Sequence, residues 1–219
     1  MASALGQLTR LSSASYELSG FSRPMPGERA CGDALALYPH EERVTILVVD
    51  GLGHGSKAHE ASCAAVAQVT ERLAGDPATG LEELMQSCHR ALAGPRGAAI
   101  GICRLDPRAK RLSFCGVGNI SLVSLPARRG LGVSLAGVVG YRMRRVKEFV
   151  SPLSQGDLIA LYSDGISSKF SLQGFRGKPL DPEVEAAARL ADDSDDATLV
   201  LARIKFQQQT SSPPDRSSP

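Results

Sequence analysis

The sequence predicts an α+β fold in which two packed sheets are flanked by helices. Three observations lead to this prediction: most of the chain is patterned as short strands, a pair of helices follows the strand that ends at Asp50, and one short helix stands late in the chain. A doubly wound α/β protein would alternate strands with helices, and an all-β protein would lack the helices. A layered arrangement of sheets and helices accounts for the pattern.

Strands dominate the first fifty residues. Residues 7–19 mix apolar and polar side chains without a helical period, which predicts a first strand. Residues 34–38 and 43–50 are two further apolar runs, separated by Pro39-His40-Glu41-Glu42. Proline and polar residues between two such runs predict a hairpin.

Two helices are expected next. Residues 56–74 carry Val66, Val69 and Leu73 at helical spacing and are followed by Gly75, and residues 81–92 carry a second apolar stripe. The remaining pattern is that of strands with one helix near the end: strands at 98–105, 111–117, 120–125, 146–150, 157–163 and 197–204, and a helix at 183–190.

Length and composition predict one domain over residues 1–206 and a disordered tail at 207–219, because the tail is Gln, Ser and Pro with almost no apolar residue. The formal net charge of +2 gives no indication of nucleic-acid binding. No apolar run approaches the ~20 residues of a membrane span. The five cysteines show neither metal-ligand spacing nor a disulfide framework. We therefore expect a reduced, cytoplasmic protein, and a monomer.

Acidic residues stand at the ends of three apolar runs. Asp50 ends one predicted strand, Asp164 ends another, and Asp195 and Asp196 precede the last. Acids so far apart in sequence can still converge in a fold. Carboxylates without a paired His or Cys favour a hard cation, Mg²⁺ or Mn²⁺, over zinc. Taken alone, each Asp-Gly is also an ordinary turn.

Gly51-Leu52-Gly53-His54-Gly55 lies between a strand and a helix, which also suggests nucleotide binding. The glycine spacing is GxGxG and not GxGxxG, and a second helix follows where a strand ending in an acid is expected. This alternative is therefore the weaker one.

Four motifs together, VVDGLGHGS, FCGVGNI, SDGIS and DDATLVLAR, resemble the metal-dependent protein serine/threonine phosphatases of type 2C. Within that family they are most similar to the SpoIIE-like branch and its RsbX-like stressosome phosphatases. The resemblance covers about residues 10 to 205 and implies a four-layer α/β/β/α sandwich. It also implies two Mn²⁺ or Mg²⁺ ions that activate a water molecule for attack on phosphorus.

The resemblance assigns roles to five residues. It implies that Asp50 bridges the two ions, that the carbonyl of Gly51 binds one of them, and that Asp164 binds the second. Asp195 aligns with the remaining metal ligand, and Asp33 resembles the acid that holds metal-bound water. In addition, the Gly-Val-Gly-Asn segment that ends at residue 119 resembles a turn near the family's active site.

Three positions depart from the family pattern. Eukaryotic relatives carry His directly after the first Asp-Gly, where this chain has Leu52, so His54 is only a candidate for protonating the leaving group. The acid that helps to bind a third metal is replaced by Ser168. The arginine that grips phosphate in some relatives has no secure match, although Arg29 lies nearby.

The resemblance implies hydrolysis of phosphoserine or phosphothreonine on a STAS-domain regulatory protein, of the RsbS or RsbR kind, in a bacterial partner-switching pathway. The alternative is a catalytically silent pseudophosphatase that binds a partner. Retention of the metal acids argues against that alternative.

Overall fold

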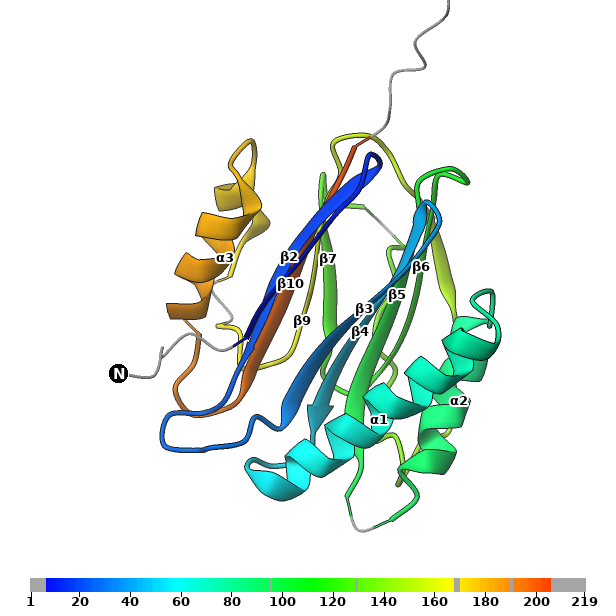
Figure 1. Ribbon diagram of the computed structural model, residues 1–219, viewed down its shortest axis with the longest axis vertical. Helices are drawn as coiled ribbons and strands as arrows, with labels where there is room; N and C mark the ends of the chain where they lie inside the picture. The colour runs from blue at the N-terminus through cyan, green and yellow to red at the C-terminus, as the bar shows by residue number, and fades with distance from the viewer. Residues whose placement is uncertain (1–6, 95, 129, 168–169, 190, 206–219) are drawn as a thin grey trace, which may run out of the picture.

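The computed structural model describes residues 7–94, 96–128, 130–167, 170–189 and 191–205. Its layers run from helix α3 (Leu180–Arg189) through two sheets to helices α1 (Ser56–Gly75) and α2 (Leu81–Ala91), as Figure 1 shows. The predicted four-layer α/β/β/α sandwich is thus confirmed.

The strands form two five-stranded antiparallel sheets. The first has the order β1-β2-β10-β9-β7, formed by Gln7–Ser12, Tyr16–Arg23, Ala197–Ile204, Leu158–Tyr162 and Ser121–Leu125. The second has the order β3-β4-β5-β6-β8, formed by Asp33–His40, Arg43–Gly51, Ala98–Asp106, Arg111–Val117 and Phe149–Pro152. A short 3₁₀ helix, η1 (Leu172–Phe175), packs beside α3 on the outer face of the first sheet.

The uninterrupted apolar run of β4 is explained by burial on both of its faces. Ile46 and Val48 belong to the core between the two sheets, whereas Leu47 and Val49 pack against α1 and α2. Successive side chains of a strand point to opposite faces, so a strand covered on both sides is apolar throughout. The same division holds for β10, where Val200 faces the other sheet.

Two hairpins and two helices agree closely with the sequence-based expectation. Strands β3 and β4 pair through a turn at Glu41, which has a φ of 51°. Strands β5 and β6 pair likewise. Helix α1 covers the predicted residues and ends at Gly75, and α2 ends at Ala91.

One strand prediction was wrong near the N-terminus. Residues 7–19 form two strands, β1 and β2, which pair as a hairpin. The hydroxyl of Ser13 accepts hydrogen bonds from the backbone N–H groups of Ser15 and Tyr16 at 3.1 and 3.2 Å. A short polar side chain bonded to its own backbone in this way favours a turn over continued strand.

Two boundaries also differ. The strand expected at 146–150 is β8 at Phe149–Pro152, because Val146 packs against the α1 and α2 layer and the N–H of Glu148 is bonded to the carboxylate of Glu82. Helix α3 begins at Leu180, earlier than expected, and the predicted end at residue 190 lies outside the described residues.

The expected tail at 207–219 lies outside the described residues as well. No helix in the part of the chain that the structure describes is both long and apolar enough to cross a membrane.

Candidate metal centre and active site

The site begins where the apolar layer between the sheets ends. Asp50 follows Ile46 and Val48 on the same face of β4, so its carboxylate continues the inward row at the edge of the core. Its partner across the ladder is Asp33, at the start of β3. Two acids thus face each other at the mouth of the sheets.

The antiparallel topology brings the other acids to the same edge. Strand β9 ends at Tyr162, two residues before Asp164, and β10, which pairs with β9, begins just after Asp195 and Asp196. The charges of Asp164 and Asp195 both act on Asp50. The convergence expected from the sequence is therefore present in the fold.

Asn119 joins the two sheets at this edge. Its side-chain amide donates to Oδ2 of Asp50 at 2.8 Å and to Oδ2 of Asp164 at 2.7 Å. Asn119 stands where the chain crosses from β6 in one sheet to β7 in the other. The preceding Gly118 has a φ of 97°, and a Cβ there would lie 2.4 Å from Cβ of Ala99. Glycine is therefore needed for this crossing, which explains the Gly-Asn pair in the motif.

Asp33 is set behind Asp50. It is 4% exposed, and its Oδ2 accepts a hydrogen bond from Oγ of Ser163 at 2.6 Å. Ser163 in turn accepts from the backbone N–H of Thr198 at 3.0 Å, which ties Asp33 to the end of β9 and to β10 in the other sheet. Burial, followed by the charge of Asp50, raises the pKa of Asp33 well above its usual value.

Burial and neighbouring carboxylates also raise the pKa values of Asp50 and Asp195. Burial is the main cause that raises the pKa of Asp50 to about 7, the charges of the neighbouring acids add to it, and the Asn119 hydrogen bond opposes it. Burial is likewise the first cause of the raised pKa of Asp195. Carboxylates that repel one another at a cleft are a sign of a functional site.

The donor set fits a hard divalent cation. Asp50, Asp164, Asp195 and the carbonyl of Gly51 offer only oxygen, which Mg²⁺ and Mn²⁺ prefer. Among the described residues, no three His, Cys, Asp or Glu side chains stand close enough together to be recognised as a formed metal site. The amide of Asn119 lies between Asp50 and Asp164 instead.

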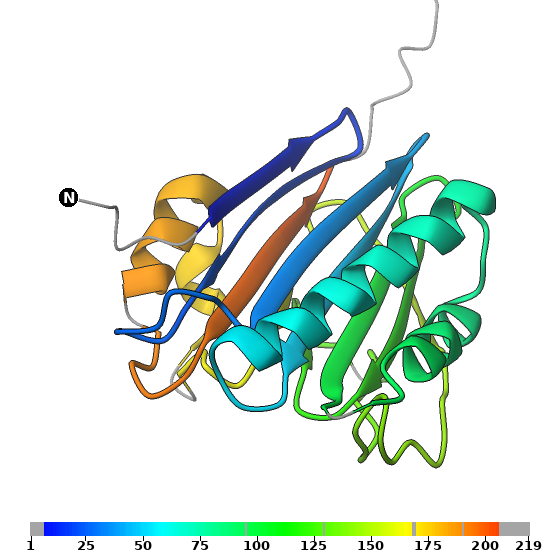
Figure 2. The same cartoon turned by 60° about the horizontal axis from the view of Figure 1, so that its bottom comes forward.

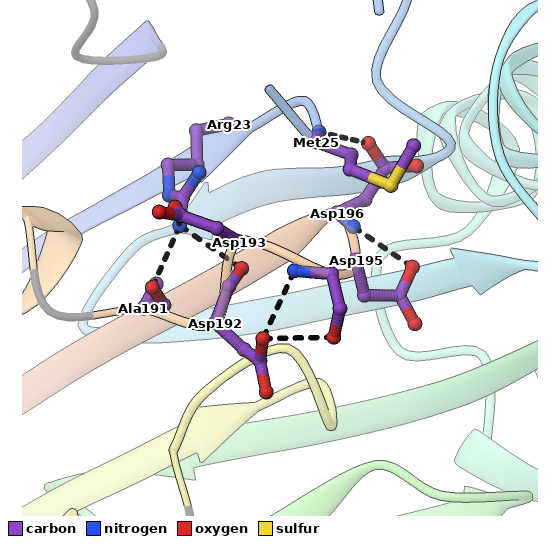
Figure 3. Close-up of polar contacts among 8 residues, drawn as sticks. Arg23, Met25, Ala191, Asp192, Asp193, Asp195 and Asp196 are labelled. Atoms are coloured by element: carbon purple, nitrogen blue, oxygen red, sulfur yellow. Dashed lines mark hydrogen bonds and ion pairs between the residues drawn. The ribbon is translucent and has the colours of Figure 1, made fainter. Parts of the chain in front are cut away.

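The paired acids before β10 have different surroundings, as Figure 3 shows. Asp196 is 2% exposed, and its two carboxylate oxygens accept from the backbone N–H groups of Met25 and Gly32, each at 2.8 Å. Asp195 is partly exposed, and among the described residues its Oδ1 accepts from the N–H of Asp196 alone, at 2.8 Å. Asp196 therefore fastens the loop before β3, and Asp195 is the acid left to face the site.

The loop after Asp50 holds His54, the candidate proton donor. His54 Nδ1 lies 2.6 Å from Oε1 of Glu28, and the imidazole is 56% exposed. The charge of His54 acts on Asp195, so the ring is near the acids. Glu28 was not among the residues expected from the sequence, and nothing in the local pattern around it could have pointed to this contact.

Gly51 is fixed by close packing. A Cβ at this position would lie 2.3 Å from the carbonyl oxygen of Ala58 in the first turn of α1. No side chain can therefore be placed here without moving the helix, so glycine is required at this strand end.

The described residues give no catalytic role to the remaining candidate positions. Arg29 is exposed and forms no ion pair within the described ranges, and Ser168 lies outside them. Cys115 is fully buried, and burial raises the pKa of its thiol to about 12, as expected of a packing residue and not of a nucleophile.

Comparison with known proteins agrees with this geometry. The family model described as Stage II sporulation protein E (SpoIIE) matches residues 40–205. Phosphoserine phosphatase RsbX of Bacillus subtilis (strain 168) is 24% identical over 143 residues, which cover 64% of this chain and 70% of RsbX.

Two solved structures are similar over most of the chain. A crystal structure of RsbX in complex with magnesium has a TM-score of 0.77 at 18% identity, covering 91% of this chain and 100% of that one. A structure described as "The bacterial stressosome: a modular system that has been adapted to control secondary messenger signaling" has a TM-score of 0.73 at 30% identity, covering 86% of this chain and 99% of that one.

Fold and sequence together define a protein serine/threonine phosphatase with the type 2C architecture. Within this class the chain belongs to the SpoIIE family, whose model spans it from the end of β3 to the end of β10.

Proposed function

We propose that this phosphatase removes phosphate from serine or threonine of a STAS-domain regulatory protein in a bacterial partner-switching, stressosome pathway. The likeness to RsbX and to a stressosome structure supports the pathway. The observation that carries the chemistry is the gathering of Asp50, Asp164 and Asp195 at one edge of the two sheets, with one amide bonded to the first two.

We assign the binding of two divalent ions, Mg²⁺ or Mn²⁺, to Asp50, the carbonyl of Gly51, Asp164 and Asp195. The magnesium complex of the similar RsbX structure supports this choice of ion. Bound divalent ions supply positive charge for the phosphate oxygens and make water acidic enough to act as the nucleophile. Asp33, behind Asp50, would accept a proton or a water hydrogen at its carboxylate.

Residues of the chain itself orient the reaction. Asn119 holds the carboxylates of Asp50 and Asp164 from the side by its amide hydrogens. Glu28 engages Nδ1 of His54, so Nε2 is the ring atom assigned to protonate the departing serine or threonine oxygen. The nucleophile is water, so no phosphorylated side chain is required.

The first experiment measures p-nitrophenyl phosphate hydrolysis with and without Mn²⁺ for the native chain and for Asp50→Ala and Asp164→Ala. We expect metal-dependent turnover that both substitutions abolish. Asp181→Ala is the matched control, because Asp181 is an acid on α3 that pairs with Arg10 and lies outside the site. Equal turnover in all four proteins would refute the assignment of the site.

The substrate class needs a second experiment. Purified STAS-domain proteins phosphorylated on serine or threonine are incubated with the native chain and Mn²⁺, and phosphate loss is followed by mass spectrometry. Release from these proteins at a rate well above that from an unrelated phosphoprotein is expected. If the chain hydrolysed p-nitrophenyl phosphate but released no phosphate from STAS-domain proteins, the phosphatase activity would stand and the proposed substrate class would be refuted.

A further inference from the structure

A basic segment between β7 and β8 is held in place beside the site. Val139 pairs with Ala98, the first residue of β5, through two backbone hydrogen bonds of 2.9 and 3.0 Å. Val138 and Arg142 exchange two more, each 2.9 Å long, which closes a tight turn. Gly140, in that turn, donates to Nδ1 of His89 at 2.8 Å. Strand β5 and helix α2 therefore both hold this turn.

The turn is connected to the active-site loop by a short chain of contacts. The carbonyl of Gly97, next to Ala98, accepts from the N–H of Leu52 at 3.0 Å. Arg96 donates from Nη1 to the carbonyl of Leu52 at 2.8 Å. In Figure 2 the segment projects from the same end of the sheets at which β4 ends. The turn thus forms one wall beside the acids.

The side chains of residues 142–147, which continue this wall, differ in their burial. Met143 and Val146 pack against the layer of α1 and α2. Arg142, Arg144 and Arg145 are exposed, and within the described residues none of the three forms an ion pair. The neighbouring cation is engaged differently, because Nζ of Lys147 lies 4.9 Å from the ring centroid of Phe149.

The wall also exposes apolar surface. Tyr141 at the tip of the turn is 80% exposed, and Leu52 in the active-site loop is 43% exposed. On the other sheet, the loop before Asp195 carries Asp192 and Asp193, both exposed. Exposed arginines thus follow the turn that contacts the active-site loop, and exposed acids precede Asp195 in the chain.

We propose that the wall formed by Arg96, Tyr141, Arg142, Arg144 and Arg145, called here the cationic rim, binds acidic residues that flank the phosphorylated serine or threonine of the protein substrate. This inference rests on the proposed function, because it uses the site to hold the phosphate. Charge complementarity selects the occupant: an acidic segment is attracted by the exposed arginines at 142, 144 and 145, which form no ion pair among the described residues.

The first test measures binding, with no metal added so that no peptide is consumed. Two fluorescent phosphoserine peptides are compared by anisotropy at low ionic strength, one with three Asp residues beside the phosphoserine and one with three Ala residues. The acidic peptide should bind about tenfold more tightly, and Arg142→Ala/Arg144→Ala/Arg145→Ala should remove that advantage, because three exposed charge pairs, each individually weak, are lost together. Added salt should also reduce the preference for the acidic peptide.

The matched control is Arg108→Ala. Arg108 is an exposed arginine in the turn between β5 and β6, at the opposite end of β5 from Ala98. It should leave the preference for the acidic peptide unchanged. Equal affinity of both peptides for the native chain, or an equal loss in the Arg108→Ala control and the triple variant, would overturn the proposal.

Turnover separates this inference from the proposed function. The triple variant should hydrolyse p-nitrophenyl phosphate in Mn²⁺ as the native chain does, while its kcat/KM for the acidic phosphopeptide falls about tenfold, mostly through KM. A preserved binding preference in a chain without turnover would refute the proposed function alone. Normal turnover by a chain that shows no preference for the acidic peptide would refute only the proposed role of the cationic rim.

Discussion

Replacing Asp50 by Asn should stabilise the metal-free protein at alkaline pH while abolishing catalysis. The carboxylate of Asp50 is crowded by burial and by Asp164 and Asp195, which raises its pKa from 3.8 to about 7. The native state therefore holds the proton of Asp50 more tightly than the unfolded chain does. An amide of the same shape carries no charge and can still accept the hydrogen bond from Asn119.

The size and sign of this stabilisation follow from the linkage between protonation and folding. A shift of about three pKa units corresponds to about 4 kcal/mol, at about 1.4 kcal/mol per unit. This contribution to stability is fully present below pH 4, where both states are protonated. It is lost as the pH rises through about 7, the pKa of Asp50 in the folded protein. The charge of Asp50 also raises the pKa of Asp33, so the two effects are not independent. We expect Asp50→Asn to gain about 2 to 4 kcal/mol at pH 8 and much less at pH 5.

Urea denaturation in the presence of a chelator measures this difference. Midpoints and slopes are recorded at pH 5 and pH 8 for the native chain, Asp50→Asn and Asp181→Asn. The control removes an acid from α3 whose side chain is 44% exposed, so its effect should be small at both pH values. If Asp50→Asn were no more stable than the native chain at pH 8, the reasoning from carboxylate crowding would be wrong.

Three further substitutions test other parts of the site. Asn119→Ala removes a hydrogen bond that lowers the pKa of Asp50, so this pKa should rise further. The acid limb of the pH–rate profile in Mn²⁺ should then move to higher pH. Asp196→Ala removes the acceptor of two backbone N–H groups and should cost about 2 to 3 kcal/mol in urea denaturation. Gly51→Ala places a Cβ 2.3 Å from a carbonyl oxygen of α1 and should reduce kcat about 100-fold, whereas Gly75→Ala, which meets nothing within 4 Å, should not.

Local patterns predicted most of the elements because their causes are local. Strand β10 was expected at its observed residues, Ala197–Ile204, and α1 at almost all of its length. Apolar periodicity and a stop at Gly75 suffice for such elements. A distant group explains the error at β8, where Glu82 of α2 accepts a hydrogen bond from the N–H of Glu148 just before the strand. The missed hairpin of β1 and β2 has a local cause, the hydroxyl of Ser13 bonded to its own backbone.

The candidate site was predictable in part for the same reason. An acid at the end of a doubly buried strand has to emerge at the sheet edge, so Asp50, Asp164 and Asp195 could be selected from the chain alone. Their roles as metal ligands remain a prediction. Asn119 was noticed only as the end of a glycine turn, and its two carboxylate partners come from strands in different sheets.

The sequence by itself determined the strands, the helices and the acids at their ends, because apolar period and turn residues act between neighbours in the chain. Only the tertiary structure decided that Asp196 is buried and bonded to the backbone of a distant loop while Asp195 stays partly exposed, and that Glu28 contacts His54. Those contacts join segments far apart in sequence. They depend on how two sheets stack and on which side chains the stacking brings within hydrogen-bonding distance, which no local pattern encodes.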